Sequence, residues 1–118
     1  MQFKSEKAIY IQITEFVMEK ILKGEWSADQ KIPSVRDLGG ELEVNPNTAM
    51  RAYDILQQQD IIYNKRGLGF FVSKDAKKSI TSVKKKQFID VDLPQFFNTI
   101  ELLGISIEEI NSYYQKQK

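Results

Sequence analysis

One stretch, EVNPNTAMRAY at residues 43–53, decides the fold because it contains a complete signal for the start of a helix. Asn45 is a residue type favoured at the N-cap, and Pro46 then takes the first helical position, where a missing backbone N–H has no consequence. Apolar residues follow at helical spacing and predict a buried stripe of Ala49, Ala52, Tyr53 and Leu56. A helix is therefore predicted to begin at Pro46.

The exposed side chains near the start of this helix are hydrogen-bonding groups. The buried stripe leaves Asn47, Thr48 and Arg51 on the outer face. A helix N-terminus offers backbone N–H groups and a positive dipole to phosphate, and Asn and Arg side chains can read adenine and guanine edges. The structural alternative is that Asn45-Pro46 caps a helix as it would in any protein. The residues therefore predict a recognition helix only if the neighbouring elements complete a DNA-binding fold.

Two helices are predicted before this stretch. Over residues 8–23 apolar residues recur at helical spacing, and Gly24 follows as a stop; the apolar positions are Ile9, Ile13, Phe16, Val17 and Ile21. Ser34, three residues before Asp37, has the spacing of a capping box that opens a second, shorter helix. The inward stripe of that helix is Val35, Leu38 and Leu42, which leaves Arg36 pointing outward.

A β-hairpin is predicted after the third helix. Residues 61–65 and 70–73 are β-prone and flank a turn at residues 66–69 that contains two glycines. The tip is basic, because Lys65 and Arg66 adjoin the turn. Three short helices followed by such a hairpin describe a winged helix-turn-helix, whose wing contacts DNA backbone or minor groove beside the recognition helix.

These motifs, taken together and in order, resemble the N-terminal domain of the GntR superfamily, in particular its short YtrA-type branch. The resemblance covers about residues 8 to 73 and rests on residues 31–38 (KIPSVRDL), 44–48 (VNPNT), 51–53 (RAY) and 63–72. It implies that Arg36 contacts DNA from the second helix. It further implies that the recognition helix carries Asn45, Asn47, Thr48 and Arg51. The wing would be formed by Lys65, Arg66, Gly67 and Gly69.

Several positions depart from the family pattern. Relatives outside this branch often carry basic residues where Pro46 and Met50 stand, so their base contacts do not transfer to this chain. Gly39-Gly40 stands within the second helix where the family often has alanine, and it predicts a soft helix, since each glycine costs roughly 1 kcal/mol against alanine. Glu43 stands where the turn often has glycine and is prone to strain, whereas Asp60, also in place of glycine, tolerates left-handed backbone. The remaining departure is Phe70, in place of a commoner threonine.

The C-terminal third, residues 74–118, is predicted to be a helical arm. Apolar residues continue at helical spacing from Ile80 to Leu103, and Pro94 should kink or split this helix near residues 90 to 93. Gly104 ends it. Ser106 and Glu109 then form a capping-box pattern, with Ile105 and Ile110 placed as a hydrophobic staple, and open a last helix.

Two short helices cannot bury this many large apolar groups against each other, so a second copy of the chain is predicted to cover them. The residues expected at this homodimer interface are Phe88, Phe96, Phe97, Ile100, Leu103, Ile110, Tyr113 and Tyr114. The alternative is that the arm folds back on its own winged domain. The resemblance favours dimerisation, because YtrA-type proteins have two short helices in place of a full effector domain. Two-fold symmetry would present two recognition helices to half-sites one helical turn, roughly 34 Å, apart.

Composition excludes several other classes. The chain has 118 residues, 42% of them hydrophobic, which suits one small domain plus an appendage. It lacks His and Cys, and with them the common general base, the thiol nucleophile and the usual transition-metal ligands. No enzyme, catalytic residue, metal or cofactor is therefore predicted. The absence of a hydrophobic signal core or long apolar run predicts a cytoplasmic protein that does not enter a membrane.

The sequence therefore predicts a mainly α protein with a small β-hairpin: a winged helix-turn-helix DNA-binding domain at residues 1–73 and a dimerisation arm at residues 74–118. By the resemblance, it is a bacterial transcriptional regulator, a repressor, that binds a double-stranded DNA operator. The net charge of only +1 supports the alternative of a winged-helix protein-interaction module without DNA binding. A third hypothesis, a small-molecule effector held at a dimer seam between Phe96, Phe97, Tyr113 and Tyr114, names no ligand.

Overall fold

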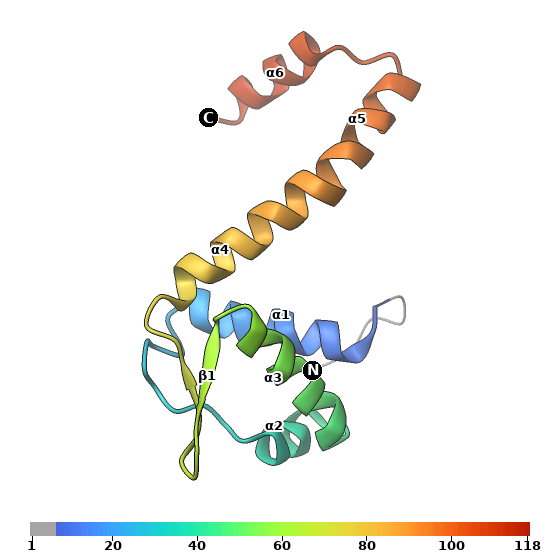
Figure 1. The fold of residues 1–118 in the computed structure, drawn as a ribbon. Helices are drawn as coiled ribbons and strands as arrows, with labels where there is room; N and C mark the ends of the chain where they lie inside the picture. Colours follow the sequence, from blue (N-terminus) through green and yellow to red (C-terminus); the bar gives the residue numbers. More distant parts are fainter. Residues whose placement is uncertain (1–6) are drawn as a thin grey trace. The chain divides into compact units, whose positions relative to one another are not determined.

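The computed structural model describes residues 7–118, which belong to two compact units, Met1–Ser82 and Val83–Lys118. The first unit contains α1 (Ile9–Leu22), α2 (Val35–Leu42), α3 (Pro46–Gln58), β1 (Ile62–Lys65) and β2 (Gly69–Val72), followed by the first turns of α4 (Ala76–Gln87) (Figure 1). Ala76 and Ile80 are buried, which places the start of α4 in the first unit. The functional division at residue 73 stays a prediction.

The helices begin where the local signals predicted. The hydroxyl of Ser34 accepts a hydrogen bond from the Asp37 N–H at 3.1 Å, and the side-chain oxygen of Asn45 accepts one from the Asn47 N–H at 2.8 Å. Each cap satisfies a backbone donor that the first helical turn leaves without a partner. The helices α2 and α3 are therefore fixed at their starts, and the turn between them sets the helix-turn-helix geometry.

The core of the first unit joins the three helices to the hairpin. Fully buried side chains come from α1, α2, α3 and both strands: Ile13, Val17, Leu38, Leu56, Ile62 and Val72. Helix α3 packs against both α1 and α2. Phe70, which replaces a commoner threonine, is also largely buried, and its ring meets that of Tyr53 edge-on at 4.9 Å between centroids. Phe70 thus links the hairpin to α3.

The hairpin is antiparallel, with Ile62 opposite Val72 and Lys65 opposite Gly69. A third segment pairs with the other edge of β2, because the Ile32 N–H donates to the Phe70 carbonyl at 2.9 Å and the Val72 N–H donates to the Gln30 carbonyl at 2.9 Å. The base of the wing is therefore held on both sides, while its tip projects beyond the helices (Figure 1). The fold of this unit is the predicted winged helix.

Tyr53 links α3 to the segment that precedes α2 through a hydrogen bond. Its ring is fully buried, and its hydroxyl donates to the carbonyl oxygen of Pro33 at 2.7 Å. Burial raises the pKa of Tyr53 far above its usual value, so the hydroxyl remains a donor at any physiological pH.

Replacing Tyr53 by Phe should therefore lower the free energy of unfolding by about 1–2 kcal/mol, because the half-buried Pro33 carbonyl loses its donor. Thermal unfolding followed by circular dichroism measures the change. Tyr63→Phe is the matched control, since the Tyr63 hydroxyl bonds the exposed Asp29 carboxylate at 3.0 Å and should matter less. Equal decreases in the free energy of unfolding of the two variants would show that the Tyr53 hydroxyl contributes no more to stability than the Tyr63 hydroxyl.

Two features of the backbone explain residues that departed from the family pattern. Glu43 and Asp60 both have left-handed backbone, with φ of 58° and 60°. Glu43 ends α2 in this conformation, as a C-terminal glycine would.

Gly39 is buried, and a Cβ atom at this position would lie 2.9 Å from the carbonyl oxygen of Val44. A side chain at 39 would therefore force the α2–α3 turn to shift, whereas a Cβ at Gly40 would meet open space.

The second unit is helical. It contains the rest of α4, a π-helical segment η1 (Phe88–Asp92), α5 (Leu93–Leu102) and α6 (Ile107–Lys116). Pro94 lies in the first turn of α5, and the backbone stays helical at Asp92 and Leu93. The missing N–H and the bulk of proline are accommodated by the wider turn of η1 rather than by a break in the chain. Ser106 caps α6 by accepting from the Glu109 N–H at 3.1 Å, as predicted.

Candidate nucleic-acid interface

The start of α3 presents two of its predicted side chains directly. Asn47 is exposed and Thr48 is half-buried in the first turn of the helix. Asn45 is also exposed, but its side-chain oxygen caps the helix. The structure therefore places Asn45 in a positioning role, while Asn47 and Thr48 can offer their polar groups to a ligand that approaches the helix N-terminus.

Arg51, one turn further along α3, lies against an aromatic ring. Its guanidinium carbon is 3.8 Å from the ring centroid of Tyr10, in the first turn of α1. Arg51 is exposed and Tyr10 half-buried. No local sequence pattern indicates this contact, because 41 residues separate the two positions (51 minus 10) and only the packing of α1 against α3 brings them together.

Arg36 extends the candidate interface to α2. It occupies the first turn of that helix and is exposed, next to the Ser34 cap. The buried Leu38 and Leu42 hold the opposite side of α2 in the core. The outward orientation predicted for Arg36 is therefore found, whereas a role in DNA contact stays a prediction.

The wing presents a second group of cations on an aromatic support. The rings of Tyr63 and Phe71 stack at 5.6 Å across the two strands, and the Lys65 ammonium lies 5.0 Å from the Phe71 centroid. Arg66 and Gly67 are exposed at the tip, and Gly67 has a φ of +79°. The turn therefore needs a glycine there, since other residues seldom adopt this backbone.

Lys31 also lies on the wing and was missed by sequence reasoning. A Cβ atom at Gly69, which has a φ of +111°, would lie 3.2 Å from the side-chain Cε of Lys31. Lys31 reaches this place because its segment pairs with β2, through a bridge to Phe71. The resemblance motif contained Lys31, but only the pairing of distant segments shows that it belongs to the wing.

The cations of this surface are not neutralised within the described part of the molecule. Among residues 7–118, no ion pair to a carboxylate involves the five cations of the candidate interface, which are Lys31, Arg36, Arg51, Lys65 and Arg66. In contrast, Lys20 on α1 pairs with Glu25, and Lys23, the residue that caps the end of α1, pairs with Glu19. The five cations thus have no carboxylate at ion-pair distance within the described part of the chain, although the net charge of the chain is only +1.

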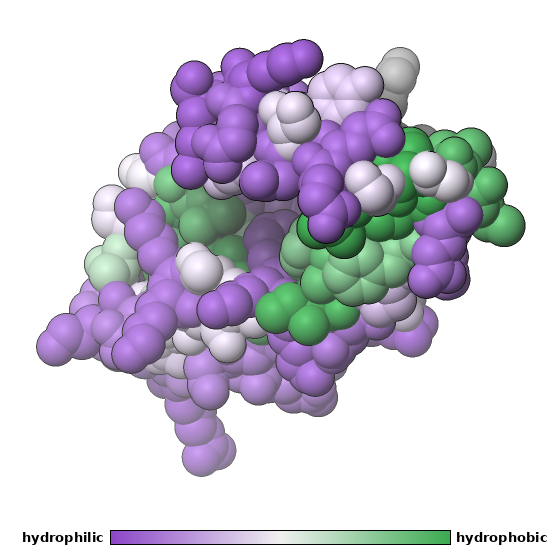
Figure 2. Space-filling view, turned by 90° about the horizontal axis from the view of Figure 1, so that it is seen from above, coloured by the Kyte–Doolittle hydropathy of each residue, from purple (hydrophilic) through white to green (hydrophobic). Residues whose placement is uncertain are grey.

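The residues predicted for dimerisation fall into two groups in the second unit. Exposed side chains are Phe88, Phe96, Phe97, Leu103, Tyr113 and Tyr114. Ile100 is buried within the single chain, and Ile110 is half-buried. Leu102 is 87% exposed and Ile107 56% exposed, although neither was predicted. Figure 2 shows apolar groups, in green, beside hydrophilic ones on the face seen from above. So much exposed apolar surface is typical of an interaction site.

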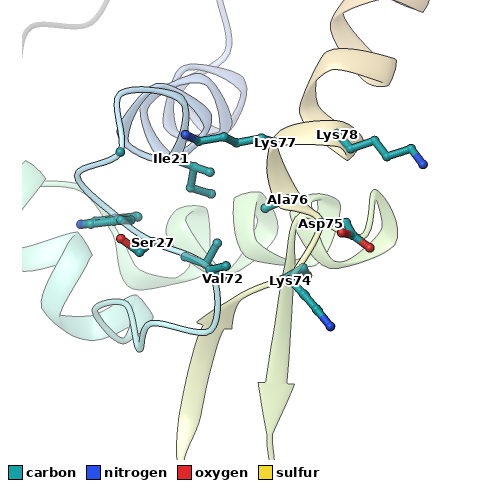
Figure 3. A pocket seen from close by; sticks show the side chains of 12 residues that line it. Ile21, Ser27, Val72, Lys74, Asp75, Ala76, Lys77 and Lys78 are labelled. Carbon is teal, nitrogen blue, oxygen red and sulfur yellow. The ribbon is translucent and has the colours of Figure 1, made fainter.

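A cavity of about 450 Å³ lies between the end of α1, the loop after it and the start of α4 (Figure 3). Ile21, Val72 and Ala76 form its apolar floor, and Lys77 extends across it. None of its polar lining side chains is buried. The cavity therefore lacks the fixed polar groups that orient a small molecule, and it is lined by none of the aromatic residues of the predicted effector seam.

Residues 7–118 show no sign of two other kinds of site. The structure described there contains no group of three His, Cys, Asp or Glu side chains that could hold a metal ion. No helix in that part of the chain has both the length and the apolar character that a membrane span requires.

The chain is similar to known proteins of one family. Residues 9–72 match the family described as "Bacterial regulatory proteins, gntR family". The HTH-type transcriptional repressor YtrA of Bacillus subtilis is 32% identical over 113 residues, which cover 96% of this chain and 86% of YtrA.

Two solved structures show the same fold at different lengths. A GntR-family transcriptional regulator from Bacteroides thetaiotaomicron is 46% identical with a TM-score of 0.80, covering 94% of this chain and all of that one. The DNA-binding domain of AraR, solved in complex with operator ORR3, is 31% identical with a TM-score of 0.54, covering 62% of this chain and 90% of that domain. The chain therefore belongs to the gntR family of bacterial transcriptional regulators, and within it to the YtrA-type branch.

Proposed function

We propose that this chain is a cytoplasmic, homodimeric transcriptional repressor that binds a two-fold DNA operator. The observation that carries the proposal is the set of five cations on α2, α3 and the wing of one winged helix, which have no carboxylate partner among residues 7–118. In this assignment α3 enters the major groove with Asn47, Thr48 and Arg51. The wing, with Lys65 and Arg66, lies on the adjacent backbone or minor groove.

The exposed apolar side chains of the second unit support the homodimer. A second copy of the same surface would cover them by an isologous contact and would bring two winged helices to one operator. The similarity to the repressor YtrA supports repression, and the similarity to the operator complex of AraR supports operator binding. The proposal extends both properties from those proteins to this chain.

In the direct test, the full chain selects duplexes from a random DNA library. The affinity of the chain for the enriched duplex is then measured at several salt concentrations. A two-fold motif should be enriched, and the affinity should fall steeply with salt because phosphate contacts release counterions. A protein-interaction module would enrich no motif. That outcome would remove the proposed function.

Removal of one wing cation, Lys65, should change the salt dependence of DNA binding by a predictable amount. Each phosphate that a cation no longer neutralises makes the slope of log affinity against log salt shallower by about 1, so Lys65→Ala should change the slope of a dimer by about 2. Lys78→Ala removes the same charge from α4, outside the candidate interface, and is the matched control. Equal slopes for Lys65→Ala and the unchanged protein would exclude Lys65 from the phosphate contacts.

A further inference from the structure

The contact between Arg51 and Tyr10 couples the start of α1 to the recognition helix. The guanidinium carbon of Arg51 lies 3.8 Å from the centroid of the Tyr10 ring, well inside the range of a cation–π contact. An N–H group pointing at the ring would hold the guanidinium carbon farther from the centroid, so a separation of 3.8 Å indicates that the guanidinium stacks on one face of the ring. The contact therefore uses a face of the guanidinium, and it leaves the N–H groups along its edges directed away from the ring.

Arg51 makes this contact although a carboxylate is close by in sequence. Asp54 follows three residues later on α3, at a spacing that permits an ion pair on a helix surface. Arg51 forms no ion pair with it. Both residues are exposed, so the aromatic ring, rather than an acidic neighbour, determines where the guanidinium lies.

We propose that Tyr10 is a positioning residue for DNA recognition, and that Arg51 remains on its ring while its edge N–H groups contact the O6 and N7 atoms of a guanine. The inference rests on the proposed function. An exposed arginine samples many rotamers, and ordering them opposes binding. A ring that holds the guanidinium beforehand removes part of this cost, and it also fixes the angle at which the bidentate contact is made.

Arg51 and Tyr10 contribute to DNA recognition in different ways. Arg51 supplies the donors that discriminate guanine from other bases. Tyr10 touches no DNA in this scheme and acts only through Arg51. Its removal should therefore reduce discrimination while leaving the number of phosphate contacts, and hence the salt slope, unchanged.

A double-mutant cycle on the enriched duplex tests this coupling. Tyr10→Leu should weaken binding about tenfold, and Arg51→Ala should weaken it at least as much. Adding Tyr10→Leu to Arg51→Ala should have no further effect, because the ring then has nothing to hold. Tyr10→Phe keeps the aromatic face and should bind within about twofold of the unchanged protein.

Selection from the random library gives a second readout that a purely structural role would not change. Tyr10→Leu and Arg51→Ala should both lose the preference for guanine at the same position of each half-site, and Tyr10→Phe should retain it. Thermal unfolding of each variant controls for stability. The inference is overturned if the effects of Tyr10→Leu and Arg51→Ala add independently, or if Tyr10→Leu keeps the guanine preference.

The failure of this inference is distinguishable from the failure of the proposed function. If the unchanged protein enriches no duplex, the proposed function fails and takes the inference with it. If a duplex is enriched but Tyr10→Leu weakens the Arg51→Ala variant as much as it weakens the unchanged protein, only the inference fails.

Discussion

A glutamate in place of Phe97 is expected to convert the proposed dimer into monomers of 13.7 kDa and to weaken binding to a two-fold operator by roughly 10²-fold or more. Phe97 lies on α5 and is 42% exposed, with its ring 6.0 Å from that of Phe96. In the proposed dimer a partner covers this ring, and a carboxylate there would be buried without a counter-charge. Each winged helix would then bind its half-site alone, without the high effective concentration that a linked partner provides.

Light scattering measures the mass, and titration of the selected duplex measures the affinity. Asn98→Glu introduces the same charge at the next residue of α5, which is polar and exposed, and is the matched control. The control should stay dimeric. If Phe97→Glu also remains a dimer with unchanged affinity, the exposed aromatic side chains of the second unit do not form the interface.

The second large effect concerns the turn of the helix-turn-helix. Gly39→Ala should lower the free energy of unfolding by about 2 kcal/mol, and the melting temperature by roughly 10 °C, because the new Cβ overlaps a backbone oxygen that cannot move aside freely. The overlapping atom is the carbonyl oxygen of Val44, 2.9 Å from the Cβ position. A shift of this carbonyl would also displace Pro46 and the start of α3, so DNA affinity should fall as well.

Gly40→Ala is the control for this prediction, because it makes the same chemical change one residue later. Gly40 is exposed, and its Cβ would have nothing within 4 Å. The substitution should therefore stabilise α2 by up to about 1 kcal/mol, as alanine does in place of glycine within a helix. Two stabilising substitutions would show that the α2–α3 turn tolerates a side chain at 39.

Much of the fold was predictable because its signals are local. Ser34, Asn45 and Ser106 each cap the helix that their own sequence neighbourhood predicted. The hairpin followed from β-prone residues around a glycine-containing turn. In all of these cases the determining contacts span only a few residues, so neighbouring residue types carry the information.

The features that sequence reasoning missed depend on contacts between distant segments. Gly39 was interpreted as a residue that softens a helix, whereas the structure shows a close approach that excludes a side chain. The stacking of Arg51 on Tyr10 and the place of Lys31 over Gly69 need the packed unit. Pro94 did indicate a disturbed helix, but the π-helical form of η1 follows from how the chain absorbs the proline.

The cap at the start of α3 gives Asn45 and Asn47 different roles, because the Asn45 side chain bonds the backbone of the helix. Adenine offers one acceptor and one donor to the major groove, so a matching amide must give its NH2 group and its oxygen to the same base. The oxygen of Asn45 is already committed to the Asn47 N–H. Of this pair, only Asn47 can give its whole amide to an adenine without sharing an oxygen with the cap, so we expect an adenine at the tip of the helix to be read by Asn47.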